Sequence, residues 1–275
     1  MEKYAAIFEQ FKLDNRVAIV TGGAGLLGKE FCFTLAAAGA KVVIADLNEK
    51  GAHAVAAELK TEGLEALPLL TDVTSPVSVR QLVEQTLTAF GRLDILVNSA
   101  ALDPKFDPQH SGDSTTFEDY PLEYWNQALA VNLTGVFLCC QAAIPPMVKQ
   151  GKGVIINLSS IYGITAPDQR LYRQQGKPPQ YKPAYYPVTK AGILGLTAYL
   201  AAAYGEKNIR VNALSPGGVY NHHDEEFVRS YSARTMLRRM ANKDDLNGAL
   251  LFLASDASAY MTGANLIVDG GWSAW

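Results

Sequence analysis

Short runs rich in Val, Ile and Leu alternate with longer helical stretches along almost the whole chain. Seven runs are typical of strands: Arg16–Val20, Lys41–Ala45, Ala66–Leu70, Asp94–Asn98, Gly153–Leu158, Ile209–Leu214 and Asn265–Val268. Most are continuously apolar, which indicates strands buried on both faces of a parallel sheet. The helical stretches between them are Leu26–Ala38, Glu49–Glu62, Pro76–Phe90, Leu122–Lys149 (expected to form two helices), Ala184–Tyr204 and Asp244–Ala254. This alternation predicts a doubly wound, Rossmann-like α/β fold with a parallel sheet of about seven strands.

Length and composition indicate that residues 1–275 form a single domain, with residues 1–15 as an N-terminal helical extension that packs on the body or on a neighbouring subunit. A net charge of −3 offers no basic surface for nucleic acid or an anionic membrane. No apolar run approaches the ~20 residues of a membrane span, and the start lacks the apolar core of a signal peptide, so we expect a cytoplasmic protein. The three cysteines lack metal-ligand spacing and are expected to be small buried side chains, so no metal is predicted.

A glycine-rich turn between the first strand and the first helix predicts a dinucleotide site, because its backbone N–H groups can approach a pyrophosphate at the helix N-terminus. The residues expected to form it are Gly22, Gly25, Leu27 and Gly28. Asp46 ends the second strand, where a carboxylate can bind ribose hydroxyls and repel a 2′-phosphate. No Arg or Lys follows it directly, since the next residue is Leu47, and the sequence therefore favours NAD over NADP. The alternative is that Asp46 only caps the next helix.

A tyrosine and a lysine share one face of the helix predicted at 184–204. Tyr186 and Lys190 are four residues apart, which places their Cβ atoms ~5–6 Å from each other. The unperturbed pKa of a phenol is about 10, and a nearby ammonium favours the tyrosinate and brings that pKa toward the working pH. Tyr185 is excluded because it has no lysine at i+4, and Pro187 is acceptable in a first helical turn. The pair predicts an acid–base site beside the nucleotide pocket.

These motifs, in order and on the expected elements, make nearly the whole chain resemble the short-chain dehydrogenase/reductase family, in its compact Ser-Tyr-Lys branch. The resemblance implies catalytic roles for Asn132, Ser160, Tyr186 and Lys190. Tyr186 would be the acid or base at the substrate oxygen, Ser160 would orient that oxygen, and Lys190 would lower the pKa of Tyr186 and bind the nicotinamide ribose. Asn132 would hold a water that links Lys190 to solvent.

The same resemblance implies an NAD-dependent oxidoreductase that transfers a hydride between NAD(H) and a secondary alcohol or ketone, and that forms homodimers or homotetramers. The further cofactor contacts that it implies are Asp72, Val73, Asn98, Ala100, Tyr186, Lys190, Pro216, Gly217 and Val219. One departure concerns Leu26, which stands where the compact branch has its middle glycine. The turn instead fits the extended branch of nucleotide-sugar epimerases and dehydratases. Two alternatives remain: an isomerase or dehydratase that uses the same Tyr and Lys but retains bound NAD, and a non-catalytic dinucleotide sensor on the same fold that keeps the glycine turn.

Two long polar segments, 102–119 and 167–183, follow the fourth and fifth strands, at the sheet edge where ligands bind in such folds. The second is a basic, Pro-rich insertion with four cations and one acid: Arg170, Arg173, Lys177, Lys182 and Asp168. We expect Arg170 and Arg173 to contact a small polar, possibly anionic, sugar-like substrate, although such basic loops are ordinarily just solvated. His222 is expected either to contact the substrate or to be simply exposed. The run Ser160–Asp168, this insertion, the run Ser215–Gly218 and the Gly271-Trp272 end together also resemble the flagellin modification protein A type, dehydrogenases of amino-sugar or nonulosonic-acid pathways.

Overall fold

The computed structural model describes residues 2–103, 116–172 and 181–275. Seven parallel strands form one sheet in the order β3-β2-β1-β4-β5-β6-β7. The strands are β1 (Val17–Thr21), β2 (Lys41–Asp46), β3 (Ala66–Leu70), β4 (Ile95–Asn98), β5 (Gly153–Leu158), β6 (Ile209–Pro216) and β7 (Asn265–Val268). After β3 at one edge, the chain returns to the centre and adds β4 beside β1, which creates the switch point where ligands bind in doubly wound folds. The predicted fold class is confirmed.

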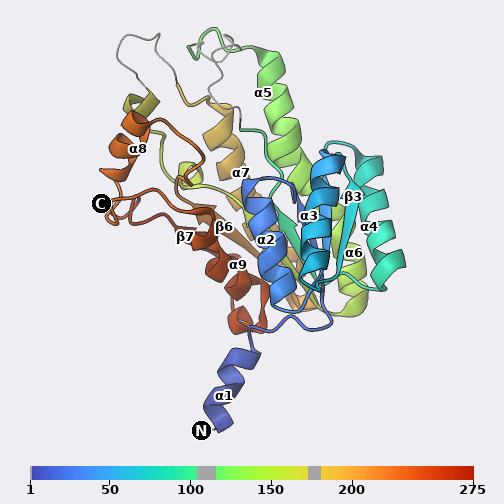
Figure 1. The fold of residues 1–275 in the computed structure, drawn as a ribbon. Helices are drawn as coiled ribbons and strands as arrows, with labels where there is room; N and C mark the ends of the chain where they lie inside the picture. Colours follow the sequence, from blue (N-terminus) through green and yellow to red (C-terminus); the bar gives the residue numbers. More distant parts are fainter. Residues whose placement is uncertain (1, 104–115, 173–180) are drawn as a thin grey trace.

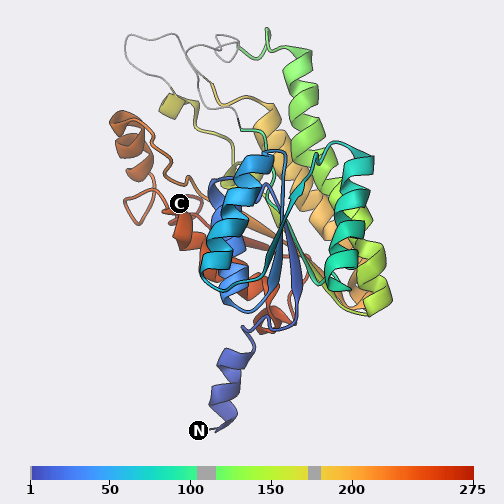
Figure 2. The ribbon, with the colours of Figure 1, turned by 45° about the vertical axis from the view of Figure 1, so that its right-hand side comes forward.

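Helices cover both faces of this sheet (Figures 1 and 2). The α-helices of the described chain are α1 (Glu2–Glu9), α2 (Leu26–Ala37), α3 (Glu49–Thr61), α4 (Pro76–Phe90), α5 (Leu122–Leu129), α6 (Gly135–Gln150), α7 (Tyr185–Tyr204), α8 (Glu225–Ser232) and α9 (Asn247–Ala254). Side chains of α2, α3 and α9 form one hydrophobic core with the sheet, and those of α4, α6 and α7 form the other. Neighbouring strand residues serve opposite cores, as Ile19 and Val20 do. Burial on both faces is the reason why the strand sequences are continuously apolar.

The segment predicted as two helices, Leu122–Lys149, is instead one helix of 29 residues, Leu122–Gln150. Its middle, Ala130–Thr134, is a π-helical turn that joins α5 to α6 without a break. Among the described residues it is the one helix that is long and apolar enough to span a membrane, and 44% of its most apolar window is buried in the fold. Here α6 packs against α4, β4 and β5, as a core helix does.

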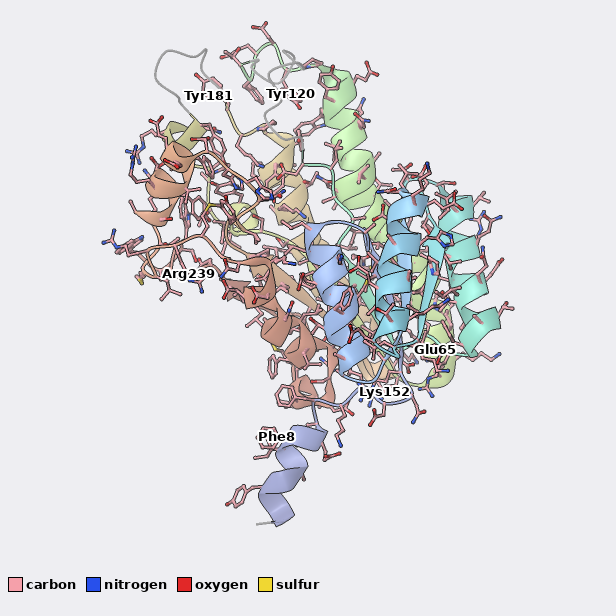
Figure 3. The ribbon with its side chains drawn as sticks, in the orientation of Figure 1. Phe8, Glu65, Tyr120, Lys152, Tyr181 and Arg239 are labelled. Atoms are coloured by element: carbon pink, nitrogen blue, oxygen red, sulfur yellow. The ribbon has the colours of Figure 1, made fainter. Side chains whose placement is uncertain are left out.

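Helix α1 stands apart from the sheet and its covering helices at one end of the molecule (Figures 1 and 2). Its Tyr4 and Phe8 side chains are exposed, and Figure 3 shows Phe8 projecting from this helix. The body of the protein therefore leaves this apolar face uncovered, and the expected packing of residues 1–15 on a neighbouring subunit stays a prediction. The expectation that Cys32, Cys139 and Cys140 are buried is confirmed.

Candidate active site

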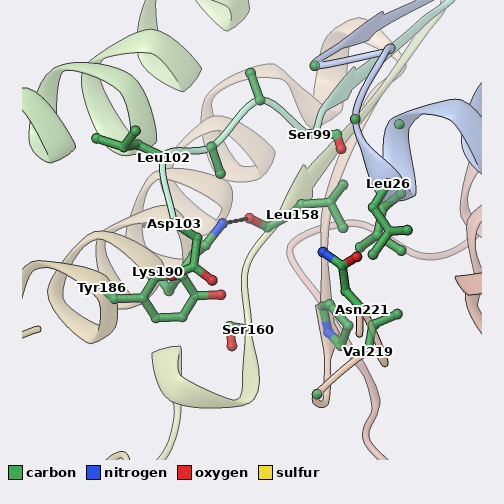
Figure 4. A pocket seen from close by; sticks show the side chains of 18 of the residues that line it. Leu26, Ser99, Leu102, Asp103, Leu158, Ser160, Tyr186, Lys190, Val219 and Asn221 are labelled. Atoms are coloured by element: carbon green, nitrogen blue, oxygen red, sulfur yellow. Dashed lines mark hydrogen bonds between the residues drawn. The ribbon is translucent and has the colours of Figure 1, made fainter. Parts of the chain in front are cut away.

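A cavity of about 1240 Å³ opens at the carboxyl ends of the strands, along the switch point between β1 and β4 (Figure 4). Most of the residues predicted to bind the cofactor line it: Gly22, Gly25, Leu27, Gly28, Asp46, Leu47, Asp72, Val73, Ala100, Pro216, Gly217 and Val219. Ser160, Tyr186 and Lys190 line the same cavity. The structure therefore brings the predicted nucleotide residues and the predicted acid–base residues into one space.

The glycine turn leaves no room for side chains at two of its positions. Gly22 has φ +65°, and a Cβ added there would lie 2.8 Å from the Cα atom of Ala100. A Cβ on Gly28 would lie 2.0 Å from the carbonyl oxygen of Gly22. Leu26, the departure from the compact pattern, is the first residue of α2, and its side chain lies at the cavity rim with 40% exposure. No side chain caps α2, so its first N–H groups are available for an anion, as a pyrophosphate site requires.

The other end of the cavity is built around Asp46 at the end of β2. Its Oδ2 atom accepts a hydrogen bond from the Ala24 N–H at 2.9 Å, and its Oδ1 atom accepts one from the Asn48 N–H at 2.8 Å. Asn48, not Asp46, caps α3 by accepting a hydrogen bond from the Gly51 N–H, so the capping alternative for Asp46 is wrong. Among the described residues that line the cavity, the Lys and Arg side chains are Lys182 and Lys190. Within the described lining of the cavity, no Lys or Arg side chain therefore accompanies Asp46 at this end.

Tyr186 and Lys190 lie in the first turns of α7, and Ser160 follows β5. Lys190 is 4% exposed, and its Nζ atom donates a hydrogen bond to the Leu158 carbonyl oxygen at 2.8 Å (Figure 4). The same Nζ atom lies 5.8 Å from the centre of the Tyr186 ring. Figure 4 shows the Tyr186 hydroxyl directed toward Ser160. The three side chains therefore converge on one wall of the cavity.

Burial dominates the electrostatics of this pair. It strongly raises the pKa of Tyr186; the Asp103 carboxylate raises it further, and the hydrogen bond with Ser160 lowers it. Burial also lowers the pKa of Lys190 from 10.5 to about 8, against the opposing effect of Asp103. The pKa of Tyr186 is therefore raised on balance, because desolvation outweighs the hydrogen bond that lowers it. The predicted lowering of this pKa by Lys190 stays a prediction. At neutral pH the phenol holds its proton and is a hydrogen-bond donor.

Two predicted residues lie beneath the cavity rather than on its wall. Asn132 is fully buried in the π-helical turn, and its amide binds the backbone of Leu102 twice: Oδ1 accepts from the N–H at 2.6 Å and Nδ2 donates to the carbonyl at 2.9 Å. Asn98 is also buried, and its Nδ2 atom donates to Oδ1 of Asn157 at 2.8 Å. Both side chains fix the floor of the site. The water-holding role that the family resemblance implies for Asn132 would fall to its backbone groups.

The predicted substrate residues differ in where they lie. His222 lines the cavity, in the left-handed backbone conformation with φ +56°. Arg170 does not line it; its guanidinium is exposed and binds the Asp168 carboxylate, with Nη2 and Oδ2 2.9 Å apart. Arg234 binds the same carboxylate. Arg173 lies outside the described residues. The predicted contact of Arg170 with the substrate is therefore not supported by its position.

Several residues of the site were not singled out from the sequence. Lys182 and Asp103 line the cavity and form an ion pair with each other. An aromatic wall, formed by Tyr162, Tyr172, Phe227 and Tyr231, lies on the same side of the cavity as Tyr186. Lys182 was counted only as one cation of the basic insertion, and the tyrosines carry no motif. Within the described residues, no group of three or more potential metal ligands occurs.

Comparisons with known proteins agree on one family. A family model described as Enoyl-(Acyl carrier protein) reductase matches residues 24–273. The chain is 38% identical over 279 residues to the short chain dehydrogenase/reductase astE of Aspergillus oryzae, covering 96% of this chain and 97% of that protein. It is 34% identical to D-threitol dehydrogenase of Mycolicibacterium smegmatis, covering 96% and 95% of the two chains. The crystal structure of a gluconate 5-dehydrogenase from Burkholderia cenocepacia in complex with NADP and tartrate matches with a TM-score of 0.86 and 31% identity, covering 98% and 99%. The chain belongs to the short-chain dehydrogenase/reductase family of oxidoreductases.

Proposed function

We propose that this oxidoreductase transfers a hydride between NAD(H) and a secondary alcohol or ketone, with Ser160, Tyr186 and Lys190 at the reacting end of the cavity. The observation that carries the proposal is that these three side chains line the same cavity as the uncapped N-terminus of α2 and its glycine turn. A nicotinamide dinucleotide would supply the hydride acceptor or donor. The residues of this chain would bind the substrate oxygen and move its proton.

In the reductive direction, the Tyr186 hydroxyl would donate its proton to the substrate oxygen while the Ser160 hydroxyl holds that oxygen by a hydrogen bond. The raised pKa of Tyr186 keeps the phenol protonated at neutral pH, which suits this role. In the oxidative direction, the same oxygen atom of Tyr186 would have to accept a proton, so alcohol oxidation should accelerate as the pH rises. Lys190, with a pKa of about 8, would lie close enough to its titration to exchange a proton with Tyr186.

We propose NAD rather than NADP as the cofactor. Asp46 lies where the adenosine ribose would bind, and none of the described lining residues at that end is a lysine or an arginine. A 2′-phosphate would therefore meet a carboxylate with no compensating charge. The ratio of kcat/KM with NAD to kcat/KM with NADP tests this proposal, and we expect at least about tenfold preference for NAD, the equivalent of 1.4 kcal/mol. Asp46→Ser should reduce that preference, and a wild-type preference for NADP would refute the assignment.

The described cavity favours a hydroxylated substrate such as a polyol or a sugar over a multiply charged one. The aromatic wall offers apolar faces for the carbon skeleton, while Lys182, Asp103 and Asn221 offer donors and acceptors for hydroxyl groups. Arg170 is neutralised by Asp168, and Lys182 by Asp103, so no free arginine faces the cavity from the described part of the insertion. The relatives named above give no support to a flagellin modification activity, and it is not part of this proposal.

The experiment is a panel of polyols, sugars, sugar acids and sugar phosphates with NAD, followed by the absorbance of NADH. Turnover of a polyol or sugar that is lost in Tyr186→Phe and in Ser160→Ala would support the proposal. Bound NAD with an isomerised or dehydrated product and no net NADH would instead support the isomerase alternative. Nucleotide binding without any turnover would support the sensor.

We also propose that the protein is a homodimer or homotetramer, in which α6 and α7 meet a second copy. Both helices carry large apolar side chains on the outside, including Phe137 on α6 and Tyr199 on α7.

A further inference from the structure

Side-chain amides fix the described parts of the two long polar segments, next to the cavity. Gln169, in the first part of the insertion, binds the backbone of Lys182: its Oε1 atom accepts from the N–H at 2.8 Å and its Nε2 atom donates to the carbonyl at 3.2 Å. Asn132 fixes Leu102 in the same way, and Asp103 follows directly. Tyr181 and Tyr120, which border these segments, lie at the same end of the molecule in Figure 3. The clamps therefore hold Lys182 and Asp103 in fixed backbone positions.

Lys182 and Asp103 meet beside Tyr186. The Lys182 Nζ atom lies 4.0 Å from the centre of the Tyr186 ring, whereas Nζ of Lys190 lies 5.8 Å from it. The Lys182 side chain is 10% exposed, and its ammonium is ion-paired with the Asp103 carboxylate. Figure 4 shows Asp103 close to Tyr186 and Lys190. The ammonium nearest to the ring thus comes from the insertion and not from the Tyr-x-x-x-Lys motif.

A cation over the face of an aromatic ring is attracted by the electrons of that ring, and the attraction is stronger where water is excluded. Ionisation of the phenol puts more negative charge on the ring and its oxygen, so an ammonium at this place favours the tyrosinate over the phenol. The Asp103 carboxylate acts in the opposite sense and disfavours the tyrosinate. The two members of the ion pair therefore exert opposed effects on the same proton.

We propose that Lys182 is a positioning residue for Tyr186. The Lys182 ammonium holds the Tyr186 ring and promotes ionisation of its phenol, and the Asp103 carboxylate opposes that ionisation. This inference rests on the proposed function, in which Tyr186 exchanges a proton with the substrate. The opposed effects of the Lys182 ammonium and the Asp103 carboxylate then set the acidity of the catalytic phenol. The proposed role also gives a reason why Lys182, from the insertion, and Asp103, from the segment after β4, both line the cavity that holds the motif residues.

The test must separate an electrostatic role from a merely structural one. The charged and titratable groups that face Tyr186 are Asp103, Tyr162, Tyr172, Lys182, Lys190 and Tyr231, with the Ser160 hydroxyl as a hydrogen-bond partner. Either Lys182→Met or Asp103→Asn breaks the ion pair between the two segments. A structural bridge would therefore respond to both substitutions in the same direction, whereas the proposed electrostatic role requires opposite directions.

The measurement is a pH titration of a fluorinated tyrosine placed at position 186 in the full chain, followed by fluorine NMR. Fluorination lowers the intrinsic pKa of the phenol, which brings its ionisation to a lower pH. We expect Lys182→Met to raise the pKa of this group by about one unit, Asp103→Asn to lower it, and Lys182→Arg to leave it near the wild-type value. Arg170→Met is the matched control, since it removes an exposed cation of the same insertion outside the cavity, and it should leave the pKa unchanged.

Shifts in the same direction for Lys182→Met and Asp103→Asn, or no shift in either, would overturn the proposal. The titration needs neither substrate nor cofactor, so it reads the role of Lys182 even if the panel of alcohols gives no turnover. Where turnover is found, the pH profile of kcat/KM for oxidation of the fastest alcohol of that panel should move in the same directions as the NMR titration. A protein with the expected NMR shifts and no turnover would refute the proposed function and leave the electrostatic arrangement intact.

Discussion

Asn132 and Asn212 are two buried asparagines with the same hydrogen-bonding arrangement and different neighbours, and they allow stability to be separated from activity. Each is fully buried. Asn132 clamps the N–H and carbonyl of Leu102 at 2.6 and 2.9 Å. Asn212 accepts from the Ala264 N–H at 3.0 Å and donates to the Met261 carbonyl at 2.9 Å, in the segment before β7. Only the Asn132 clamp fixes a segment that lines the cavity.

Substitution of either asparagine by alanine removes two hydrogen bonds to the backbone. At Asn212 the Met261 carbonyl keeps a second, longer hydrogen bond from Arg210 Nη1 at 3.3 Å. A net loss of about 1 kcal/mol for each bond, together with the cost of unpaired buried groups, gives about 2–4 kcal/mol for each variant. The free energies of unfolding should therefore fall by similar amounts. Asn132→Ala should in addition lower kcat/KM at least about tenfold, because small displacements of groups around a reacting centre cost rate steeply. Asn212→Ala should retain activity within about twofold of the wild type when corrected for the folded fraction.

Urea unfolding followed by circular dichroism gives the stabilities, and initial rates with NAD and the fastest alcohol of the panel give the activities. The reasoning would be refuted if both variants lost stability equally and retained equal activity, because the Leu102 clamp would then have no bearing on the site. It would also fail if Asn132→Ala lost activity without losing stability. That result would assign the Asn132 side chain a direct chemical role, which its two bonds to Leu102 leave no room for.

Three further predictions follow from other parts of the molecule. Gly28→Ala should abolish NAD binding in calorimetry, because its Cβ would lie 2.0 Å from the Gly22 carbonyl oxygen. Gly248→Ala is the control: nothing lies within 4 Å of its Cβ, so it should leave NAD binding unchanged and raise the free energy of unfolding by about 0.5–1 kcal/mol. The pKa of Lys190 is lowered to about 8 in the folded chain from 10.5, so the unfolded chain binds more protons between these values and stability should rise with pH across that window. Lys190→Met should inactivate the enzyme and remove the rise in stability between pH 7 and pH 9.5, as measured by urea titrations. At pH 7 it should raise the free energy of unfolding by at most about 3 kcal/mol, reduced by the free energy of the lost hydrogen bond to Leu158. Tyr199→Glu, at a side chain that is 69% exposed on α7, should shift the mass in light scattering from oligomer to monomer, and an unchanged mass would exclude α7 from the interface.

The sequence predicted the sheet well because its signal is local and strong. All seven strand segments appear in the structure, with ends that differ by at most two residues, since a strand buried on both faces needs apolar residues at every position. The helix α8 was missed because its buried side carries few apolar residues, Phe227, Val228 and Tyr231, in a charged segment. The single helix Leu122–Gln150 was predicted as two, because a π-helical turn keeps the chain helical without leaving a mark in composition.

The sequence allowed prediction of those active-site residues that belong to motifs of characteristic spacing. Ser160, Tyr186 and Lys190 were placed in one site by their motifs, and the structure brings them to one cavity. The protonation of Tyr186 was not predictable in this way, because a four-residue spacing describes one neighbour and says nothing of the solvent that the fold removes. Lys182 was not predictable either, since its position depends on Gln169 and on Asp103, which is 79 residues distant along the chain.

Because Tyr186 is desolvated, the charged and polar groups around it have a large effect on the ionisation of its phenol. The surroundings of Tyr186 and Lys190 drive both groups toward their neutral forms, yet proton exchange with an alcohol requires the phenol to become an anion in the course of the reaction. Where the surroundings desolvate a group, fixed groups must supply that stabilisation, and each such group acts more strongly there than it would in bulk solvent. The fixed groups around Tyr186 are the Ser160 hydroxyl and the two ammonium groups, of which that of Lys182 lies closest to the ring. An insertion that delivers one of these charges can therefore adjust the acidity of Tyr186 without any change in Ser160, Tyr186 or Lys190.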